Sequence, residues 1–367
     1  MKVLVTGANG FIGKNFCLAL IENGIDDIIK IDIDSSEDEI IDGIRKADII
    51  YHLAGINRPK SDQEFISGNV DFTREIVEFL KAENQNTPIV FSSSTQADNN
   101  SPYGKSKVDA ENIIREYSED VGSDYYIYRL PNVFGKWCMP NYNSFVATFC
   151  HNIANDLPIE VHNPTSEVDL VYIDDVCDSF LTLIKNKKEK GYRSIENTYK
   201  TTVGEVSELL YKFKESRENL ISERVGNGFY RALYATYISY LNPEKFSYVL
   251  EAHEDPRGSF CEFLKTKDSG QFSFFTAVPG ISRGGHYHHT KSEKFLVVNG
   301  SAKFVFEHIV KKERFEIEVD SSDLRVIQSI PGWAHMIENT GDENLVVMLW
   351  ANEIFNQDQP DTIATEI

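Results

Sequence analysis

Cysteine is scarce in this chain, and its positive charges are outnumbered. The five cysteines among 367 residues show no Cys-x-x-Cys spacing, which argues against a disulfide framework or a thiolate zinc site. Lysine and arginine total 37 against 57 acidic residues, and the net charge of −20 opposes binding to nucleic acid or anionic membranes. No apolar run approaches the roughly 18 residues of a membrane span. We therefore expect a cytoplasmic protein without membrane insertion and without a nucleic-acid partner.

The first half of the chain has the pattern of an α/β domain. Short β-branched runs alternate there with amphipathic helical stretches, as in a parallel sheet with crossover helices. The predicted strands are Lys2–Thr6, Ile28–Ile31, Ile49–Leu53, Ile89–Ser93 and Tyr125–Arg129, and the predicted helices are Gly13–Glu22, Thr73–Glu83 and Ser106–Glu119.

The pattern changes in the second half, where strand-like segments are separated by turn residues. From about Phe272, segments such as QFSFFTAV, EKFLVVNG and SAKFVFEHIV favour an antiparallel barrel or sandwich. Residues 205–241 read as helices that close the first domain, and Asn242–Pro243 indicates the break after them. A chain of this length favours two domains, which we place at residues 1–245 and 246–367.

The segment GANGFIG indicates a dinucleotide site. Its glycines follow the first strand and open a helix, where they permit a tight turn and close approach of a pyrophosphate. After the third strand, HLAG supplies small residues where a cofactor needs close packing, whereas His52 within it reads as a structural histidine. The predicted cofactor-binding residues are Gly7, Gly10, Phe11, Ile12, Gly13, Asp32, Leu53, Ala54, Gly55, Tyr103 and Lys107.

Asp32 bears on the choice of coenzyme. It ends the second strand, where a carboxylate accepts hydrogen bonds from the adenosine ribose and repels a 2′-phosphate, which favours NADH. The alternative is that Asp32 is a solvated member of the acidic run that extends to Glu39.

Tyr103 and Lys107 form a Y-x-x-x-K pair at the start of a helix, on one face and one turn apart. The lysine ammonium is expected to lower the tyrosine pKa, so that the phenol can exchange a proton near neutral pH, and to hold the nicotinamide ribose. The serine run before it offers a hydroxyl for a substrate carbonyl. Ser94 is the chosen residue, with Ser92, Ser93 and Thr95 as open alternatives.

The motifs GANGFIG, HLAG, SSS, YGKSK, RLPNVFG and VYIDDV occur in the order typical of the extended short-chain dehydrogenase/reductase family, which the chain resembles. The resemblance implies a Rossmann-type fold, NAD(P)-dependent chemistry on nucleotide-sugars and a Ser-Tyr-Lys triad. It also places Asn132 near the substrate, although a turn-capping role is equally open. Lys136, in the segment KWCMPNYNS, is taken as a second substrate-binding residue.

Histidines and one glutamate in the second half suggest a metal site. His286 and His288 alternate on a predicted strand and so face one side, Glu293 follows, and His335 comes after a proline-glycine turn. Together these residues resemble the paired motifs of the cupin family, which implies an all-β, RmlC-like jelly roll holding a divalent metal. Zinc fits this ligand set best, while iron, manganese or nickel would also fit.

A reductase and a cupin on one chain suggest successive steps on one sugar. The whole chain resembles the bifunctional capsule or O-antigen enzymes of UDP-N-acetyl-L-fucosamine synthesis. That resemblance implies C3 epimerisation of UDP-2-acetamido-2,6-dideoxy-L-arabino-4-hexulose, NADPH-dependent C4 reduction to UDP-2-acetamido-2,6-dideoxy-L-talose, and a homodimer joined through the cupin domain. Because Asp32 opposes NADPH, the coenzyme is left as NAD(P)H.

The same residues are compatible with two other functions. The cupin could be a metal-stabilised dimerisation module on a monofunctional 4-keto sugar reductase, or the chain could be a non-enzymatic nucleotide-sugar sensor. The acid and base of the epimerase are not identified, and Lys294, His289 and Tyr287 are the candidates near the metal motif.

Overall fold

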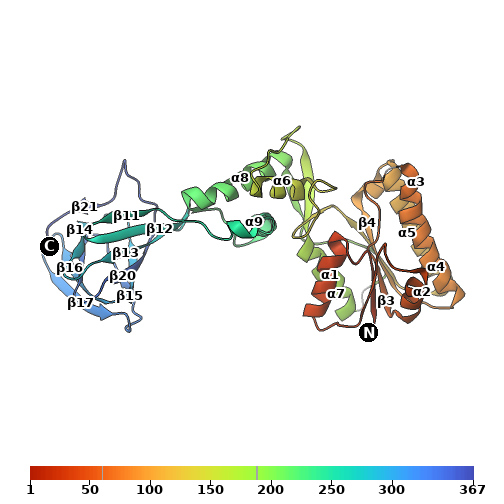
Figure 1. Cartoon of the computed structure of the whole chain (residues 1–367), viewed down its shortest axis with the longest axis horizontal. Helices are drawn as coiled ribbons and strands as arrows, with labels where there is room; N and C mark the ends of the chain where they lie inside the picture. The colour runs from red at the N-terminus through yellow and green to blue at the C-terminus, as the bar shows by residue number, and fades with distance from the viewer. Residues whose placement is uncertain (60, 187–188) are drawn as a thin grey trace. The chain divides into compact units, whose positions relative to one another are not determined.

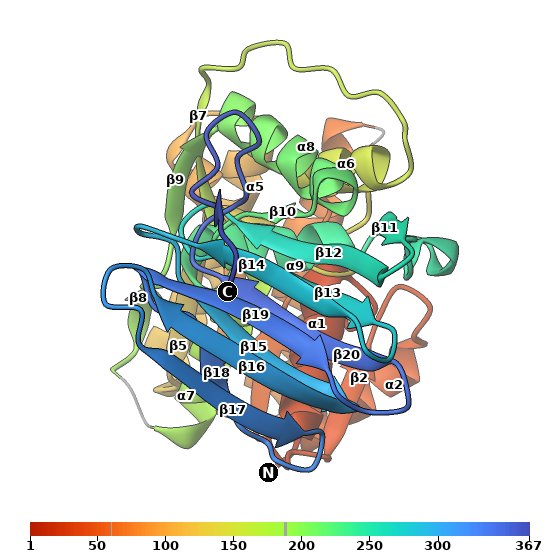
Figure 2. The same cartoon turned by 90° about the vertical axis from the view of Figure 1, so that its left-hand side faces the viewer.

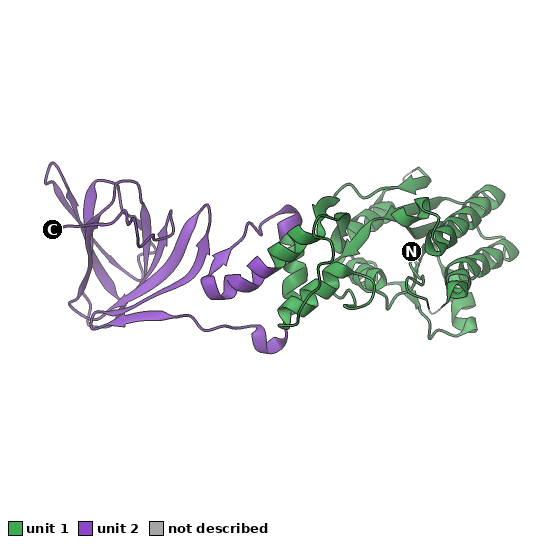
Figure 3. Ribbon diagram, turned by 90° about the horizontal axis from the view of Figure 1, so that it is seen from above, with its two compact units in different colours: residues 1–210, 231–241 green, residues 211–230, 242–367 purple. Residues whose placement is uncertain are grey.

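The computed structural model describes residues 1–59, 61–186 and 189–367 (Figure 1). It divides into two compact units, Met1–Leu210 with Arg231–Leu241 and Tyr211–Tyr230 with Asn242–Ile367 (Figure 3). The domain boundary near residue 245 stays a prediction. Within the described residues, no helix is both long enough and apolar enough to cross a bilayer.

The first unit is built on a six-stranded parallel sheet. Its strand order is β2 (Ile28–Ile31), β1 (Val3–Thr6), β3 (Ile49–His52), β4 (Ile89–Ser94), β5 (Tyr125–Leu130) and β8 (Gly191–Arg193). The chain runs from β1 to β2 on one side and returns to place β3 on the other side of β1. The order thus reverses at β1, and ligands of open α/β sheets bind at the carboxyl ends of the strands beside such a reversal.

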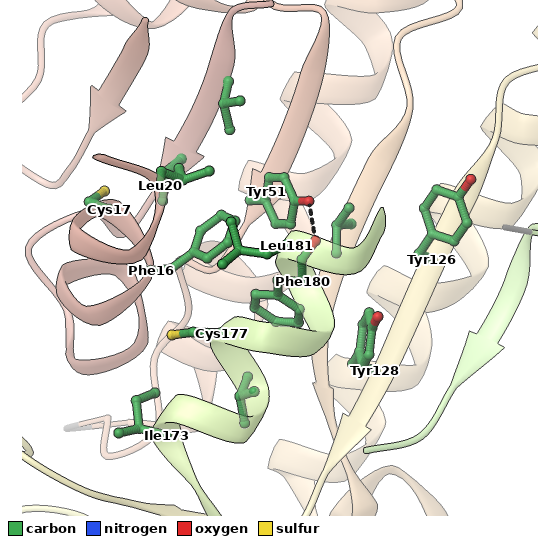
Figure 4. Close-up of a cluster of buried hydrophobic side chains, with 14 of the residues drawn as sticks. Phe16, Cys17, Leu20, Tyr51, Tyr126, Tyr128, Ile173, Cys177, Phe180 and Leu181 are labelled. Carbon is green, nitrogen blue, oxygen red and sulfur yellow. Dashed lines mark hydrogen bonds between the residues drawn. The ribbon is translucent and has the colours of Figure 1, made fainter. Parts of the chain in front are cut away.

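Helices cover both faces of this sheet. The helices α1 (Phe11–Glu22) and α7 (Ile173–Lys185) pack on one face, and α2 (Glu37–Lys46), α4 (Phe72–Ala82) and α5 (Pro102–Val121) pack on the other. On the first face, the centre of the Phe16 ring lies 4.4 Å from the centre of the Tyr51 ring and 5.4 Å from that of the Phe180 ring (Figure 4). The Tyr51 hydroxyl donates to the Phe180 carbonyl at 2.8 Å, so this aromatic core also satisfies its buried polar group.

Local sequence signals set the ends of α5, the helix that carries Tyr103 and Lys107. The Ser101 hydroxyl accepts the Gly104 N–H at 3.0 Å, and Pro102 occupies the first turn, where its missing N–H is not needed. The helix ends at Gly122, whose φ of 74° lies in the left-handed region that glycine adopts most easily.

Smaller elements complete the first unit and the stretch that follows it. A short helix, α3 (Asp62–Phe65), continues through a wider turn (Ile66–Asp71) into α4. A three-stranded sheet contains β6 (Asn132–Phe134), β7 (Glu167–Tyr172) and β9 (Tyr199–Thr202). The remaining helices are α6 (Phe145–Ala154), α8 (Val203–Asn219) and α9 (Gly228–Ile238), followed by a 3₁₀ turn at Pro243–Lys245. The turn Thr95–Asp98, also 3₁₀, joins β4 to α5.

The second unit contains two mainly antiparallel sheets. One has the order β10 (Ile221–Ser222), β12 (Gly258–Thr266), β13 (Gly270–Ala277), β20 (Leu345–Ala351), β15 (Glu293–Asn299) and β18 (Ile327–Gln328), with β11 (Ala252–Asp255) paired to β12. The other has the order β17 (Arg314–Asp320), β16 (Ser301–His308), β19 (Trp333–Asn339), β14 (Ser282–Tyr287) and β21 (Ile363–Ala364) (Figure 2).

Both sheets contribute to one apolar core, in which Phe275 and Phe295 meet Phe304 and Ile337. The predicted parallel α/β domain and the β-rich second half are therefore confirmed.

Candidate functional site

The glycine loop after β1 has the close packing that its sequence predicted. Gly7 has a φ of 64°, and a Cβ there would lie 2.9 Å from the Ala54 backbone. At Gly13 a Cβ would lie 2.1 Å from the Gly7 carbonyl oxygen, so any larger residue would push the loop away from α1. Gly10 precedes α1 without a side-chain cap, which leaves the first N–H groups of the helix available to an anion.

The other predicted cofactor residues surround this loop. The N–H groups of Leu53 and Ala54 both donate to the Thr6 hydroxyl at 3.1 Å, which ties the end of β3 to the end of β1. Phe11 and Ile12 are half-buried against the core beneath the loop. A Cβ on Gly55 would lie 3.1 Å from the Lys107 Nζ, so glycine lets the lysine approach the cofactor side of β3.

His52 has a structural role, as its sequence setting suggested. Its two ring nitrogens contact the Thr6 and Thr73 hydroxyls at 2.8 and 2.9 Å. Burial, with a smaller contribution from the Lys107 charge, lowers the pKa of His52 to about 3. The ring is therefore neutral at physiological pH.

Tyr103, Lys107 and Ser94 meet where β4 ends and α5 begins. Lys107 is buried, its Nζ donates to the Ser92 carbonyl at 3.1 Å, and it lies 5.8 Å from the centre of the Tyr103 ring. The Ser94 hydroxyl hydrogen-bonds to Tyr103 and also accepts the Gln96 N–H at 3.1 Å. The structure thus brings the three predicted catalytic side chains together.

The neighbouring serines have other partners. The Ser92 hydroxyl faces the His52 carbonyl at 3.4 Å, and the Ser93 hydroxyl donates to the Glu111 carboxylate. Both serines are buried, whereas Ser94 is only partly buried. Of the three serines, Ser94 is therefore the one whose hydroxyl lies with the phenol.

The expected lowering of the Tyr103 pKa is corrected by the structure. Burial raises the pKa of Tyr103 above its ordinary value, and the hydrogen bond with Ser94 opposes this rise only in part. The expectation relied on the Lys107 charge, but the ammonium points to the Ser92 carbonyl. Burial also lowers the pKa of Lys107 to about 8, against the opposing charge of Glu111.

An ion pair between the buried Glu111 and the partly buried Arg129 lies next to this site. The Glu111 carboxylate accepts two hydrogen bonds from Arg129, at 3.0 and 2.7 Å, and one from the Tyr192 hydroxyl at 3.0 Å. Glu111 lies one helical turn after Lys107, and Arg129 lies on β5. The pair therefore joins α5 to the sheet, and the only sequence feature that could have suggested it is the four-residue spacing of Lys107 and Glu111.

The two predicted substrate residues lie farther along the chain. Asn132 is exposed at the start of β6, and the Lys136 Nζ contacts the Asp174 carboxylate at 2.6 Å. Next to Lys136, Trp137 is half exposed and has a φ of 68°, a conformation that side chains adopt at a cost. The substrate-binding roles of Asn132 and Lys136 stay predictions.

The second unit gathers the four predicted metal ligands. The ligand atoms of His286, His288, Glu293 and His335 all lie within 4.8 Å of one another. The Oε2 atom of Glu293 lies 3.0 Å from the Nε2 atom of His288, 3.2 Å from that of His335 and 4.0 Å from that of His286. Burial alone would raise the pKa of Glu293. Hydrogen bonds from these imidazoles, with a smaller contribution from the Lys291 charge, nevertheless hold this pKa far below its usual range.

The donor set of this cluster fits a divalent metal. Three imidazoles and one carboxylate converge in a buried interior, a ligand set typical of zinc, and a divalent cation would balance the carboxylate charge. His288 also has the second partner usual for a metal ligand, because its Nδ1 contacts the Asp361 carbonyl. Within the described residues, the buried His335 Nδ1 has no hydrogen-bond partner.

Asp361 and Lys291 lie around the His–Glu cluster and contact it, and the sequence analysis did not identify either residue. The Asp361 carboxylate accepts the N–H groups of His289, Thr290 and Lys291 at 2.7 to 2.9 Å. The buried Lys291 Nζ lies 3.3 Å from the outer carboxylate oxygen of Glu293. Asp361 is far from the histidines in sequence, so no local pattern could have indicated it.

A glycine bulge brings Arg283 to the same interior. Arg283 pairs with the buried Ile337 and His286 pairs with His335, and the register shifts at Gly284 and Gly285 between them. Gly284 and Gly285 have φ values of 102° and 74°, as such a bulge requires. The Arg283 Nε donates to the Thr276 carbonyl at 2.9 Å, while its buried Nη2 has no hydrogen-bond partner among the described residues.

The three candidates for the epimerase acid and base are poorly placed. Lys294 follows the inward-facing Glu293 on β15, so it lies on the outer face, with its Nζ 5.3 Å from the Trp350 ring. Tyr287 lies between two inward histidines and therefore faces away from them, and His289 is exposed. His308 caps the turn after β16 by accepting the N–H groups of Val310 and Lys311.

Two family models match the chain, one for each half. Residues 3–196 match the NAD dependent epimerase/dehydratase family, and residues 253–363 match the polysaccharide biosynthesis C-terminal domain. The first match covers the glycine loop and the Tyr103 site, and the second covers all four predicted metal ligands.

Similarity to individual proteins extends over the whole chain. A UDP-2-acetamido-2,6-beta-L-arabino-hexul-4-ose reductase of Pseudomonas aeruginosa is 48% identical, over 100% of this chain and 99% of that protein. The crystal structure of the capsular polysaccharide assembling protein CapF from Staphylococcus aureus matches with a TM-score of 0.92 and 43% identity, covering 100% of both chains. The resemblance to this reductase and to the capsular polysaccharide protein CapF is thereby confirmed over the full chain.

A more distant structure shows the fold of the first part alone. UDP-glucuronic acid 4-epimerase from Bacillus cereus, in complex with NAD, has a TM-score of 0.57 and 19% identity, over 65% of this chain and 96% of that one.

Proposed function

Because the chain belongs to the NAD dependent epimerase/dehydratase family, we propose that it is a bifunctional nucleotide-sugar enzyme. Its substrate in this proposal is a UDP-linked 4-keto-6-deoxy-N-acetylhexosamine, UDP-2-acetamido-2,6-dideoxy-L-arabino-4-hexulose. The β-rich unit, which we assign to the cupin family, inverts C3. The first unit then reduces C4 with NAD(P)H to give UDP-2-acetamido-2,6-dideoxy-L-talose.

The observation that carries this proposal is the arrangement of Ser94, Tyr103 and Lys107 beside a glycine loop suited to a dinucleotide. It occurs in a chain that is similar from end to end to a reductase named for this 4-keto sugar. The metal-ligand cluster in the second unit supports the additional epimerase step.

Residues of the first unit donate the proton needed for the reduction and hold the substrate and the cofactor. The nicotinamide, when bound, supplies the hydride that forms the new C4–H bond and is oxidised in doing so. Tyr103 gives its phenol proton to O4, so the ketone becomes an alcohol. Ser94 holds O4 by a hydrogen bond, and Lys107 holds the ribose and balances the phenolate that remains.

The second unit offers what an epimerisation beside a ketone needs. The C4 ketone acidifies the proton on C3, and stabilising the enolate allows a new proton to enter from the other face. His286, His288, Glu293 and His335 would hold a divalent metal, with zinc favoured by this donor set, and the metal would supply a Lewis acid. Arg283 faces the same interior with a buried N–H group that can bind an anionic oxygen.

The two steps are tested together in deuterated buffer. The full-length protein is incubated with the 4-keto UDP-sugar, with and without each coenzyme, and the products are read by NMR. We expect deuterium at C3 without coenzyme and the reduced sugar with it. Tyr103→Phe should keep the C3 exchange and slow the reduction by about 100-fold or more.

His288→Ala and Glu293→Gln should lose the C3 exchange and still bind coenzyme, which is measured by titration to show that the variants remain folded. If either variant or a chelated protein exchanged C3 at the parent rate, the metal would have no catalytic part. A parent protein that reduced the sugar without exchanging C3 would instead support the dimerisation-module alternative. Parent-rate reduction by Tyr103→Phe would remove the basis of the reductase assignment.

A further inference from the structure

The loop after β2 contacts the glycine loop through one carboxylate. Asp32 lies directly after β2, and its Oδ2 accepts the Asn9 N–H of the glycine loop at 2.7 Å. Its Oδ1 accepts the Ile33 N–H at 2.9 Å, and the Asp32 N–H donates to the Ser35 hydroxyl at 3.0 Å. The carboxylate is therefore held in place before any cofactor binds, at the edge where a dinucleotide places its adenosine ribose.

The same segment lacks a partner for a phosphate. Residues 31–44 contain six acidic side chains and neither lysine nor arginine. Lys30 precedes this stretch on β2, but its charge acts on Cys17 of α1, on the sheet face opposite α2. A 2′-phosphate beside Asp32 would thus meet negative charge without a compensating cation.

The N-terminus of α2, which could otherwise receive a phosphate, is filled by the chain itself. Ser36 caps the helix by accepting the Glu39 N–H, and the Glu39 carboxylate accepts the Ser36 N–H at 2.8 Å. Glu37 and Asp38 add two more carboxylates to this first turn. Because side-chain oxygens already bind these N–H groups, an incoming phosphate would have to displace a carboxylate.

The residue after Asp32 suits an adenosine without a phosphate. The Ile33 side chain is fully exposed. An apolar side chain next to the ribose-binding carboxylate offers a surface for the adenine ring, whereas a 2′-phosphate at this position needs a cation.

From these contacts we propose that the reductase unit selects NADH over NADPH, with Asp32 as the residue that determines the choice. The Asp32 carboxylate accepts hydrogen bonds from the two adenosine ribose hydroxyls and excludes a 2′-phosphate. This inference deepens the proposed function only in its coenzyme and rests on the nicotinamide-nucleotide site, not on the identity of the sugar.

The test compares the binding of the two reduced coenzymes to the full-length protein by titrating their nicotinamide fluorescence without sugar. We expect NADH to bind at least about tenfold more tightly, the value of one charge-assisted hydrogen bond. Asp32→Asn should reduce this preference by about tenfold, and adding Ile33→Arg should turn it towards NADPH. Asp34→Asn is the matched control, because it removes the same charge from an exposed neighbour, and it should leave the preference within about twofold.

Equal or tighter binding of NADPH by the parent protein would overturn the inference, as would an effect of Asp34→Asn as large as that of Asp32→Asn. Because no sugar is present, the result is independent of the proposed reaction. A protein that bound NADH selectively but reduced no 4-keto UDP-sugar would refute the proposed function and leave this inference standing.

Discussion

Lys107 shows how its neighbours set the charge of one buried ammonium. Burial lowers the pKa of this lysine to about 8, and Glu111, one turn further along α5, raises it. The other titratable groups beside it are Tyr103 and His52, and the Lys107 charge contributes to keeping His52 neutral. Lys107 is therefore protonated below about pH 8 and loses its proton as the pH rises through that value.

The reduction rate should consequently fall as the pH rises through about 8, since the proposed step needs the Lys107 cation to hold the ribose and to balance the phenolate. Glu111→Gln removes the charge that raises the lysine pKa, so the falling limb of the pH–rate profile should move to lower pH. The measurement is kcat/KM for the 4-keto sugar between pH 6 and 10, values chosen to bracket this pKa.

Glu116→Gln provides the comparison for this variant, because Glu116 is exposed on the same helix. Its profile should overlay that of the parent. A Glu111→Gln protein with an unmoved falling limb and an unchanged melting temperature would show that Glu111 does not set the protonation of Lys107.

At the scale of elements, the turn that leads into β15 is fixed by a distant segment. Residues 289–291 join two of the predicted metal ligands, His288 and Glu293, and their N–H groups converge on the Asp361 carboxylate. Close to Asp361, β21 pairs with β14. The turn between these two residues is thus held by a carboxylate that is not one of the four clustered side chains.

Asp361→Asn should weaken metal binding by about tenfold or more, because the amide offers one acceptor oxygen in place of two and carries no charge. The measurement is the zinc dissociation constant from competition with a chelator, beside the melting temperature of the metal-free protein. Asp358→Asn, an exposed change in the same segment, should bind zinc as the parent does. Parent-like zinc affinity in Asp361→Asn would mean that the turn needs no such anchor.

The contrast between these elements explains what the sequence could predict. The glycine loop, the Tyr103–Lys107 pair and the His286–His288 pair depend on spacing within one element, so their geometry follows from helix or strand periodicity. Asp361 and the Glu111–Arg129 pair depend on tertiary packing, which no local pattern encodes. Lys294 was a candidate for the epimerase acid or base because it is next to Glu293 in the sequence. Strand alternation turns its side chain away from the cluster that Glu293 enters.

Across the second unit, one sheet has an apolar outer face. Phe274, Met348 and Leu296 form a row across β13, β20 and β15, and Phe272 and Trp350 belong to the next row. All five are at least partly exposed, and Met348 is 40% exposed. Lys294 lies beside Trp350 in the second row. Exposed apolar side chains gathered in this way are typical of protein–protein contacts, and we expect this face to join two copies of the chain.

Met348→Glu should therefore convert a dimer to a monomer, because it places two carboxylates in a symmetric apolar contact. Light scattering behind a sizing column gives the mass. Leu324→Glu, which changes an apolar residue that is 87% exposed and lies outside this face, should remain dimeric. A monomeric parent protein, or a dimeric Met348→Glu protein, would exclude this face as the interface.

The double-glycine bulge in β14 has a further consequence for how this protein can change during evolution. Arg283 and His286 are three positions apart, and they face the same interior only because Gly284 and Gly285 together oppose Met336. In a regular strand, residues two positions apart share a face. A codon deletion that removed one glycine would therefore restore ordinary alternation and keep both side chains inside. We therefore expect the site to tolerate the loss of one residue at this bulge, whereas an insertion or deletion between His286 and His288 would turn one of the two imidazoles away from the other.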